Sequence, residues 1–281
     1  MKYIPKEITE EVNITKTNPL INLAYLLVTV FGISFITFAG LGILASRLAL
    51  NMTTETEQKI GNQLSLMWSK DLNIKPNDRR LPYLTELTTK LYTQIVASED
   101  QLPLTIYVLD EVQINAMVLP GGHIFVTTGL LDAVESENEL AFVLAHELAH
   151  LEARDPVQGL GRSLVFLLAS TTFSLGSNNQ SGSSLVLFTG QLTNLKYSRT
   201  QEENADYQAM STIVKYYGHG QDSLRVFDRL VSQNLDDRFS TYFSTHPHTH
   251  DRINNLKKLA SRNNWLMNGD KTLLPREFRS K

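Results

Sequence analysis

Residues 143–155 read VLAHELAHLEARD, which places two histidines four positions apart with a glutamate directly after the first. In a helix, positions i and i+4 lie on one face, so the imidazoles of His146 and His150 can converge on one point. Zinc accepts imidazole nitrogen, and a catalytic zinc has three protein ligands and one open position. Glu147 is placed to reach a water in that position as a general base. The stretch therefore predicts two ligands of a metal site.

Another helix must supply the third ligand, and the best candidate is YSRTQEENADYQA, residues 197–209. Glu202 and Asp206 are four apart and share a face. Glu202 can bind the metal while Asp206 accepts a hydrogen bond from a ligating imidazole, the usual arrangement around metal-bound histidines. Glu203, about 100° away around the helix, is a rival ligand. The alternative is a solvated acidic helix start, because acids favour helix N-termini.

The two histidines also have an ordinary interpretation, as surface or capping residues. Against it, the residues just before the motif are strongly apolar, which predicts a largely buried helix. Burying unpaired polar groups costs on the order of a few kcal/mol each. A metal ion removes that cost, so the context of His146 and His150 favours the metal site.

The composition limits the partners and the ligand types. The chain has 281 residues, 42% of them hydrophobic, enough for one sizeable domain with its own core and additional segments. It contains no cysteine, so a metal site must be built from His, Asp and Glu. The net charge is −3, from 26 basic and 29 acidic residues without a long basic run, and we expect no nucleic-acid partner.

The stretch from Thr17 to Ser46 carries no charged residue and is long enough to cross a lipid bilayer. Its apolar residues cover every face, unlike those of a buried core helix. A cleaved signal peptide fits poorly, because acidic residues precede a run longer than a usual apolar signal region. We therefore predict a single-pass membrane protein with its helix at 19–46. A slight lysine excess before the span favours an extracytoplasmic catalytic domain.

The remaining pattern predicts an α+β fold, mostly helical with a small β-sheet. We expect a tail at 1–18, a juxtamembrane helix and linker at 47–80, and the main domain at 81–281. Residues 163–175 are apolar but too short to span comfortably, which indicates a core helix or a segment at the membrane surface. The expected elements are helices at 47–71, 84–98, 135–155, 201–217, 221–233 and within 244–260, a strand at 103–110 and two strands within 114–129.

Four stretches in one order resemble the M48 family of zinc metallopeptidases, which includes CaaX-protease, HtpX-like and outer-membrane quality-control branches. They are NAMVLPGGHIFVTTGLL (115–131), HELAH (146–150), SRTQEENAD (198–206) and THPHTHDRI (245–253). The third stretch matches a family pattern that selects Glu202 over Glu203. The resemblance thus implies a zincin-like domain with one Zn²⁺ per chain on His146, His150 and Glu202.

The resemblance also implies roles for residues outside the zinc motif. Asn115, Ala116 and Met117 are similar to the edge strand on which the family docks an extended substrate; an ordinary core hairpin is the alternative. His246 begins a His-Pro-x-x-x-x-Arg pattern that Arg252 completes. This implies that His246 lies near the zinc, stabilising the oxyanion or occupying the open position in a resting state. Arg252 would orient the carboxylates or the oxyanion.

The remaining histidines of these stretches have simpler interpretations. We interpret His248 and His250 as exposed loop residues and His123 as structural.

Together these features predict a membrane-anchored zinc metalloendopeptidase with Glu147, His246 and Arg252 in its catalytic machinery. Its substrates are expected to be polypeptides, and by resemblance alone misfolded or membrane-associated proteins. A non-catalytic binding module is the first alternative, but it has no use for Glu147. A prenyl-CaaX protease is the second, and the single span argues against it. The sequence leaves the oligomeric state open.

Overall fold

The computed structural model describes residues 18–97, 99, 101–163, 197–225, 246 and 249–278. The predicted helix at 221–233 and the apolar stretch at 163–175 lie for the most part outside these residues. His248 also lies outside them, and for His250 only its place in a helix is described.

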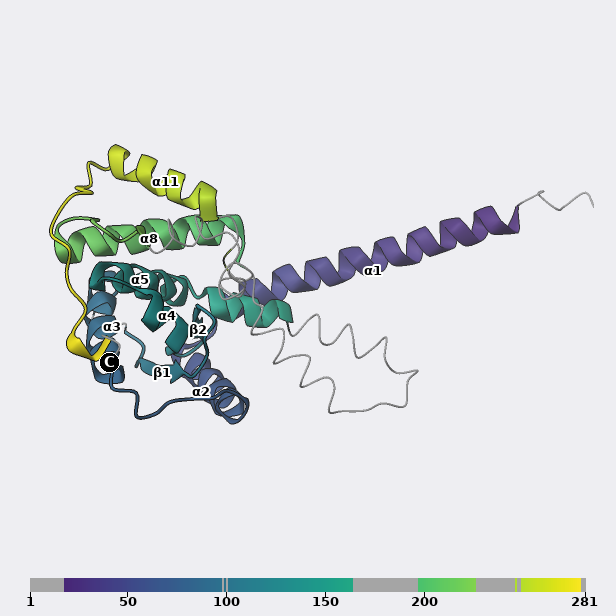
Figure 1. Ribbon diagram of the computed structural model, residues 1–281. Helices are drawn as coiled ribbons and strands as arrows, with labels where there is room; N and C mark the ends of the chain where they lie inside the picture. Colours follow the sequence, from purple (N-terminus) through teal and green to yellow (C-terminus); the bar gives the residue numbers. More distant parts are fainter. Residues whose placement is uncertain are drawn as a thin grey trace, which may run out of the picture.

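The longest helix, α1 (Pro19–Leu50), extends away from the rest of the chain (Figure 1). The Asn18 side chain accepts a hydrogen bond from the backbone N–H of Leu20 at its start, and Asn51 caps its end. The helix is strongly apolar, and its apolar side chains are largely exposed. At 1.5 Å per residue, its 32 residues exceed the roughly 30 Å of a bilayer core. The described residues thus contain one N-terminal candidate membrane helix, and it continues four residues beyond the expected end at Ser46.

The predicted β-sheet is present and has three strands, β1 (Thr105–Leu109), β2 (Ala116–Leu119) and β3 (His123–Thr127). Their order is β1-β3-β2, with β1 parallel and β2 antiparallel to β3. The turn between β2 and β3 needs glycine, because Gly121 and Gly122 have φ of 78° and 87°. Within the described residues β2 pairs with one strand only, so it forms an edge of the sheet.

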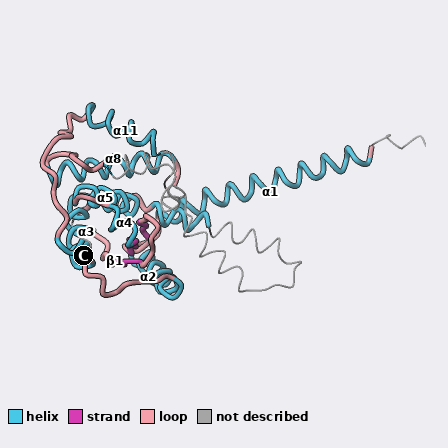
Figure 2. Tube along the Cα trace, viewed as in Figure 1, coloured by secondary structure: helices cyan, strands magenta, loops and turns pink. Residues whose placement is uncertain are grey.

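Helices cover both faces of this sheet, and alternate side chains of the strands point to opposite faces. One face contributes to the main core with α3 (Leu81–Ile95) and α5 (Glu137–Glu152). The other face packs against α2 (Thr54–Asp71), where Trp68 contacts Phe125 with ring centroids 5.8 Å apart. A short helix, α4 (Thr128–Ala133), directly follows β3. Figure 2 shows this small sheet among the helices.

Two further helices pack in series on α5. Helix α8 (Arg199–Tyr217) packs along α5, and α11 (Thr249–Arg262) packs along α8 (Figure 1). Ser198 caps α8 through a capping box with Gln201, and Gly218 ends it at φ 80°. A 3-10 turn, η3 (Arg276–Phe278), lies near the C-terminus. The mostly helical α+β fold is as predicted.

Candidate metal and catalytic site

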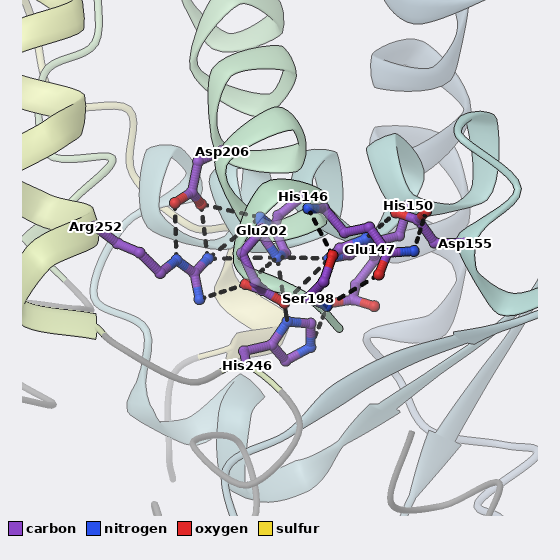
Figure 3. Close-up of polar contacts among 10 residues, drawn as sticks. His146, Glu147, His150, Asp155, Ser198, Glu202, Asp206, His246 and Arg252 are labelled. Atoms are coloured by element: carbon purple, nitrogen blue, oxygen red, sulfur yellow. Dashed lines mark hydrogen bonds and ion pairs between the residues drawn. The ribbon is translucent and has the colours of Figure 1, made fainter. Parts of the chain in front are cut away.

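Helix α5 carries two of the predicted ligands and α8 carries the third. Ser136 caps α5 as predicted, its side chain accepting from the backbone N–H of Glu139. Every residue from Asn138 to Leu151 is buried, since α5 lies between the sheet and α8. His146 and His150 are 0% exposed and face Glu202, which is 2% exposed, in the first turn of α8 (Figure 3). The structure thus brings the three residues together in the protein interior.

The donor atoms of these residues fit a metal ion. The Nε2 atoms of His146 and His150 are 3.1 Å apart. The carboxylate of Glu202 has Oε2 3.5 Å from His146 Nε2 and Oε1 3.6 Å from His150 Nε2. Tetrahedral zinc with bonds of about 2.0–2.1 Å holds its ligand atoms about 3.3 Å apart. His146, His150, Glu202 and His246 each offer a donor, and the four donors lie within 4.8 Å of one another. The set therefore has the ligand types and spacing of a zinc site.

Asp206 and Arg252 lie next to His146, with Asp206 near its Nδ1 atom. Asp206 Oδ1 is 3.1 Å from His146 Nδ1, and Arg252 Nη1 is 2.7 Å from Glu202 Oε2. Although burial opposes it, the charge and hydrogen bonds of Arg252 hold the pKa of Asp206 below its ordinary value. Burial likewise opposes the shift at Glu202, but His246, His146 and His150 lower the pKa of its carboxyl. Both carboxylates are therefore anionic, the form that binds a metal or orients an imidazole.

Two residues that the sequence did not single out contact His150. Asp155 Oδ2 lies 2.8 Å from His150 Nδ1, on the ring side away from the cluster, and Asp155 is 2% exposed. The ring of Tyr197 stacks on His150 with centroids 3.9 Å apart and planes at 14°. Asp155 stands just past the helix end, so the i, i+4 rule does not find it. An acidic residue that directly follows the His146–His150 helix is the signal that could have found it.

Glu147 is fully buried beside the cluster. Its exposure is 0%, and no described residue makes a hydrogen bond to either of its carboxylate oxygens. Oε1 lies 3.4 Å from Nε2 of His246. A carboxyl group that is buried without a hydrogen bond from the described residues is costly, so its presence needs a functional reason.

His246 lies at the cluster itself, 1% exposed (Figure 3). Its Nδ1 is 2.9 Å from Glu202 Oε1 and 3.2 Å from His146 Nε2. Burial lowers the pKa of this imidazole. His246 thus stands in the position of a fourth donor, between the ligand set and Glu147.

The other predicted residues lie apart from the cluster. The rival ligand Glu203 is exposed on the outer side of α8, where it lines a surface groove with Tyr207 and Lys258. Asn115 precedes edge strand β2, whose first residues are Ala116 and Met117.

His123 has the structural role expected of it. It is 5% exposed, with Nε2 2.9 Å from Asn62 Oδ1 and Nδ1 3.2 Å from the Tyr107 hydroxyl. Neither partner belongs to the cluster of His146, His150, Glu202 and His246.

The sequence profile of Peptidase family M48 matches residues 78–260, more than half of the chain. The chain belongs to this family. The match confirms the resemblance seen in the four sequence stretches and the prediction of a metalloendopeptidase. The matched region contains all three predicted ligands, Glu147 and the residues around them.

Several curated relatives agree with this assignment. The mitochondrial metalloendopeptidase OMA1 of Saccharomyces cerevisiae is 30% identical over 156 residues, covering 51% of this chain and 43% of the relative. A putative beta-barrel assembly-enhancing protease of Vibrio cholerae is 26% identical over 196 residues, covering 64% and 40%. A protease HtpX homolog of Acidiphilium cryptum is 28% identical over 215 residues, covering 60% and 75%. The chain spans less than half the length of the first two.

Proposed function

We propose that this M48 member is a membrane-anchored, zinc-dependent endopeptidase with Glu147 as its general base. The observation that carries the proposal is the position of Glu147. Its buried carboxylate, without a hydrogen bond from the described residues, lies beside a set of donors spaced for zinc. A purely structural metal site does not need such a carboxylate, whereas hydrolysis needs a base next to the open metal position.

Each residue of the site has a separate role in this proposed hydrolysis. Zinc held by His146, His150 and Glu202 would polarise the scissile carbonyl and lower the pKa of a water molecule to about 7. Glu147 takes a proton from the attacking water as the new C–O bond forms. It then passes that proton to the nitrogen of the leaving amine as the C–N bond breaks. Arg252 supports this by holding Glu202 and Asp206, so its role is to orient the carboxylates.

Strand β2 is suited to hold an extended polypeptide beside this site. It is a sheet edge and packs against α5, the helix that carries His146 and Glu147. A substrate that adds to this edge would make main-chain hydrogen bonds, which tolerate many side chains. The buried Oδ1 of Asn115 accepts no hydrogen bond from the described residues. Asn115, Ala116 and Met117 are therefore our proposed substrate strand.

Replacing Glu147 by Gln tests the central step. Glu147→Gln keeps the shape of the side chain but cannot accept the proton, so we expect zinc content to stay and casein cleavage to fall by at least about 100-fold. Glu203→Gln is the matched control, because Glu203 is an exposed glutamate one residue from a ligand. We expect it to cleave casein normally. Undiminished cleavage by Glu147→Gln would refute the assignment.

We further propose that α1 anchors the chain in a bilayer with the catalytic domain outside the cytoplasm. The length and apolar surface of α1 support the anchor, and the lysine excess before it supports the orientation. The names of the relatives, among them a putative beta-barrel assembly-enhancing protease, support misfolded or membrane-associated proteins as substrates. Protease added to cells or vesicles in which the membrane that holds α1 is still sealed should digest the catalytic domain. Complete protection until the membrane is lysed would reverse the orientation.

A further inference from the structure

A half-buried ion pair joins the start of α2 to the end of the helix that carries His146 and His150, and its arginine also contacts the end of α1. Arg154 lies two residues after α5 ends at Glu152. Its Nε and Nη2 donate to Oε2 of Glu57 at 3.0 and 2.6 Å, and Glu57 is only 2% exposed. Nη1 donates at 2.8 Å to the carbonyl oxygen of Leu50, the last residue of α1. Terminal helix carbonyls lack partners within the helix, so a cation satisfies one here.

Further contacts fix α1 and α2 at this place. Oε1 of Glu57 accepts a hydrogen bond from the backbone N–H of Gly121, in the turn between β2 and β3. Ser46 Oγ donates to the carbonyl oxygen of Gln158, in a helical stretch over residues 155–163. A Cβ on Gly161 would lie 2.9 Å from the carbonyl oxygen of Ala45, so the two helices approach closely. The end of α1 is thus packed onto the catalytic domain.

The residue after Arg154 contacts the metal site. Asp155 Oδ2 lies 2.8 Å from Nδ1 of His150, and its Oδ1 accepts from Nε2 of Gln201 at 2.5 Å. Gln201 directly precedes Glu202 in α8. Asp155 therefore orients one ligand and contacts the helix turn that supplies another. Such partners of metal-binding histidines fix the ring orientation and raise metal affinity.

The backbone between these two contacts is unusual. Arg154 has a φ of 57°, the left-handed conformation in which glycine is the usual residue at a helix end. A larger residue keeps such a conformation when its surroundings hold it there. Here the contacts of Arg154 with Glu57 and Leu50 do so, and the direction of this turn decides where the carboxylate of Asp155 lies.

We propose that Arg154 and Glu57 are positioning residues for the metal site, which they support through Asp155. The proposal rests on the proposed function only in that His150 is a metal ligand. It means that metal affinity depends on the docking of α1 and α2 onto the catalytic domain. The end of α1 and the start of α2 then help to hold the metal site in position, in addition to tethering the catalytic domain to the membrane.

The experiment uses the full chain in detergent micelles and measures zinc affinity by competition with a chelator. Arg154→Gly removes the side chain but suits the left-handed turn, and Glu57→Gln removes the charge of its partner. We expect each to weaken zinc binding by about 10-fold, the lower range for loss of a partner of a ligand. Glu55→Gln is the matched control in α2, because Glu55 makes an exposed pair with Lys59. It should bind zinc normally.

A double-mutant cycle separates positioning from general loss of stability. Asp155→Asn should weaken zinc binding by about 10- to 100-fold on its own. If Arg154 acts through Asp155, adding Arg154→Gly to Asp155→Asn should cause little further loss, because coupled residues are not additive. Fully additive losses, or normal affinity in Arg154→Gly, would overturn the proposal.

A milder variant covers the case in which Arg154→Gly does not fold. Arg154→Lys keeps the charge and loses the forked contact, so we expect an affinity between the wild type and Asp155→Asn. Wild-type affinity in this folded variant would also overturn the proposal. The absorption spectrum of the cobalt-loaded chain should shift in Arg154→Lys and stay unchanged in Glu55→Gln. Because metal binding is measured, the result is independent of whether Glu147→Gln abolishes cleavage.

Discussion

Arg252 forms a bidentate contact with Asp206: its Nε donates to Oδ2 at 2.8 Å and its Nη2 donates to Oδ1 at 2.7 Å (Figure 3). The same guanidinium lies 2.7 Å from Glu202 through Nη1. One cation from α11 thus holds two carboxylates of α8, one facing His146 and one within the donor set. Arginine suits this position because its planar group offers several donors in fixed directions.

Arg252→Met should therefore be costly, because it leaves two buried carboxylates without their cation. Breaking a buried ion pair from one side typically costs about 3–5 kcal/mol, and we expect a loss in the free energy of unfolding in this range. Arg252→Lys keeps the charge and should lose less. Arg262→Met, an exposed position on the same helix, is the control and should change little. Denaturant unfolding measures all three, and a neutral Arg252→Met would contradict this account.

His246 should act as a removable fourth donor. Its Nδ1 lies among the ligand atoms and its Nε2 faces Glu147, so it fills the space that a water would need. We expect His246→Ala to bind zinc less tightly and, once loaded with zinc, to cleave casein at least as fast as the wild type. Zinc affinity and kcat measured on the same preparation test this. Unchanged affinity with a lower kcat would instead assign His246 to oxyanion stabilisation.

Two tyrosines that share one glutamate should stabilise the packing of α3, α5 and α8. Tyr217 of α8 donates to Oε1 of Glu137 at 2.6 Å, and Tyr83 of α3 donates to Oε2 of the same carboxylate. Glu137 begins α5, so the three helices meet at one acidic group. Tyr217→Phe should cost about 1–3 kcal/mol of unfolding free energy, since a part-buried hydrogen bond to a carboxyl group is lost. Tyr207→Phe, at a 41% exposed position of α8, should cost much less in the same melts.

His123 should make stability depend on pH. Burial lowers its pKa below the ordinary value of 6.5, so the unfolded chain takes up a proton at a higher pH than the folded chain. The stability from neutral His123 is therefore present above about pH 6.5 and lost as the pH falls toward the folded-state pKa. His123→Gln should reduce the change in unfolding free energy between about pH 7 and pH 5. Equal pH dependence in the two proteins would exclude this role.

Local sequence rules account for much of the site. The i, i+4 spacing of His146 and His150 places both rings on one face because α5 is a regular helix. Ser136 and Gly218 mark a helix start and a helix end through caps that depend on near neighbours only. The two glycines between β2 and β3 likewise predict the turn. Such features could be predicted because each depends on a few adjacent residues.

Contacts between distant segments could not be derived in this way. The spacing of Glu202 and Glu203 leaves either as a ligand, and only the packing of α8 on α5 buries the first and exposes the second. The family resemblance chose Glu202 by its pattern, without supplying that reason. Asp155 was missed because its contact with His150 follows from the turn after α5, which no periodic pattern describes.

The sequence by itself determined which groups are available: possible ligand types without cysteine, a helix that pairs two histidines around Glu147, and an apolar segment able to span a bilayer. The tertiary structure decided which groups meet. It placed His246 among the donors, gave Asp206 and Glu202 a shared cation, and brought Leu50 and Glu57 to Arg154. The physical reason is that spacing along a helix is local, whereas these contacts depend on how separate helices pack around one core.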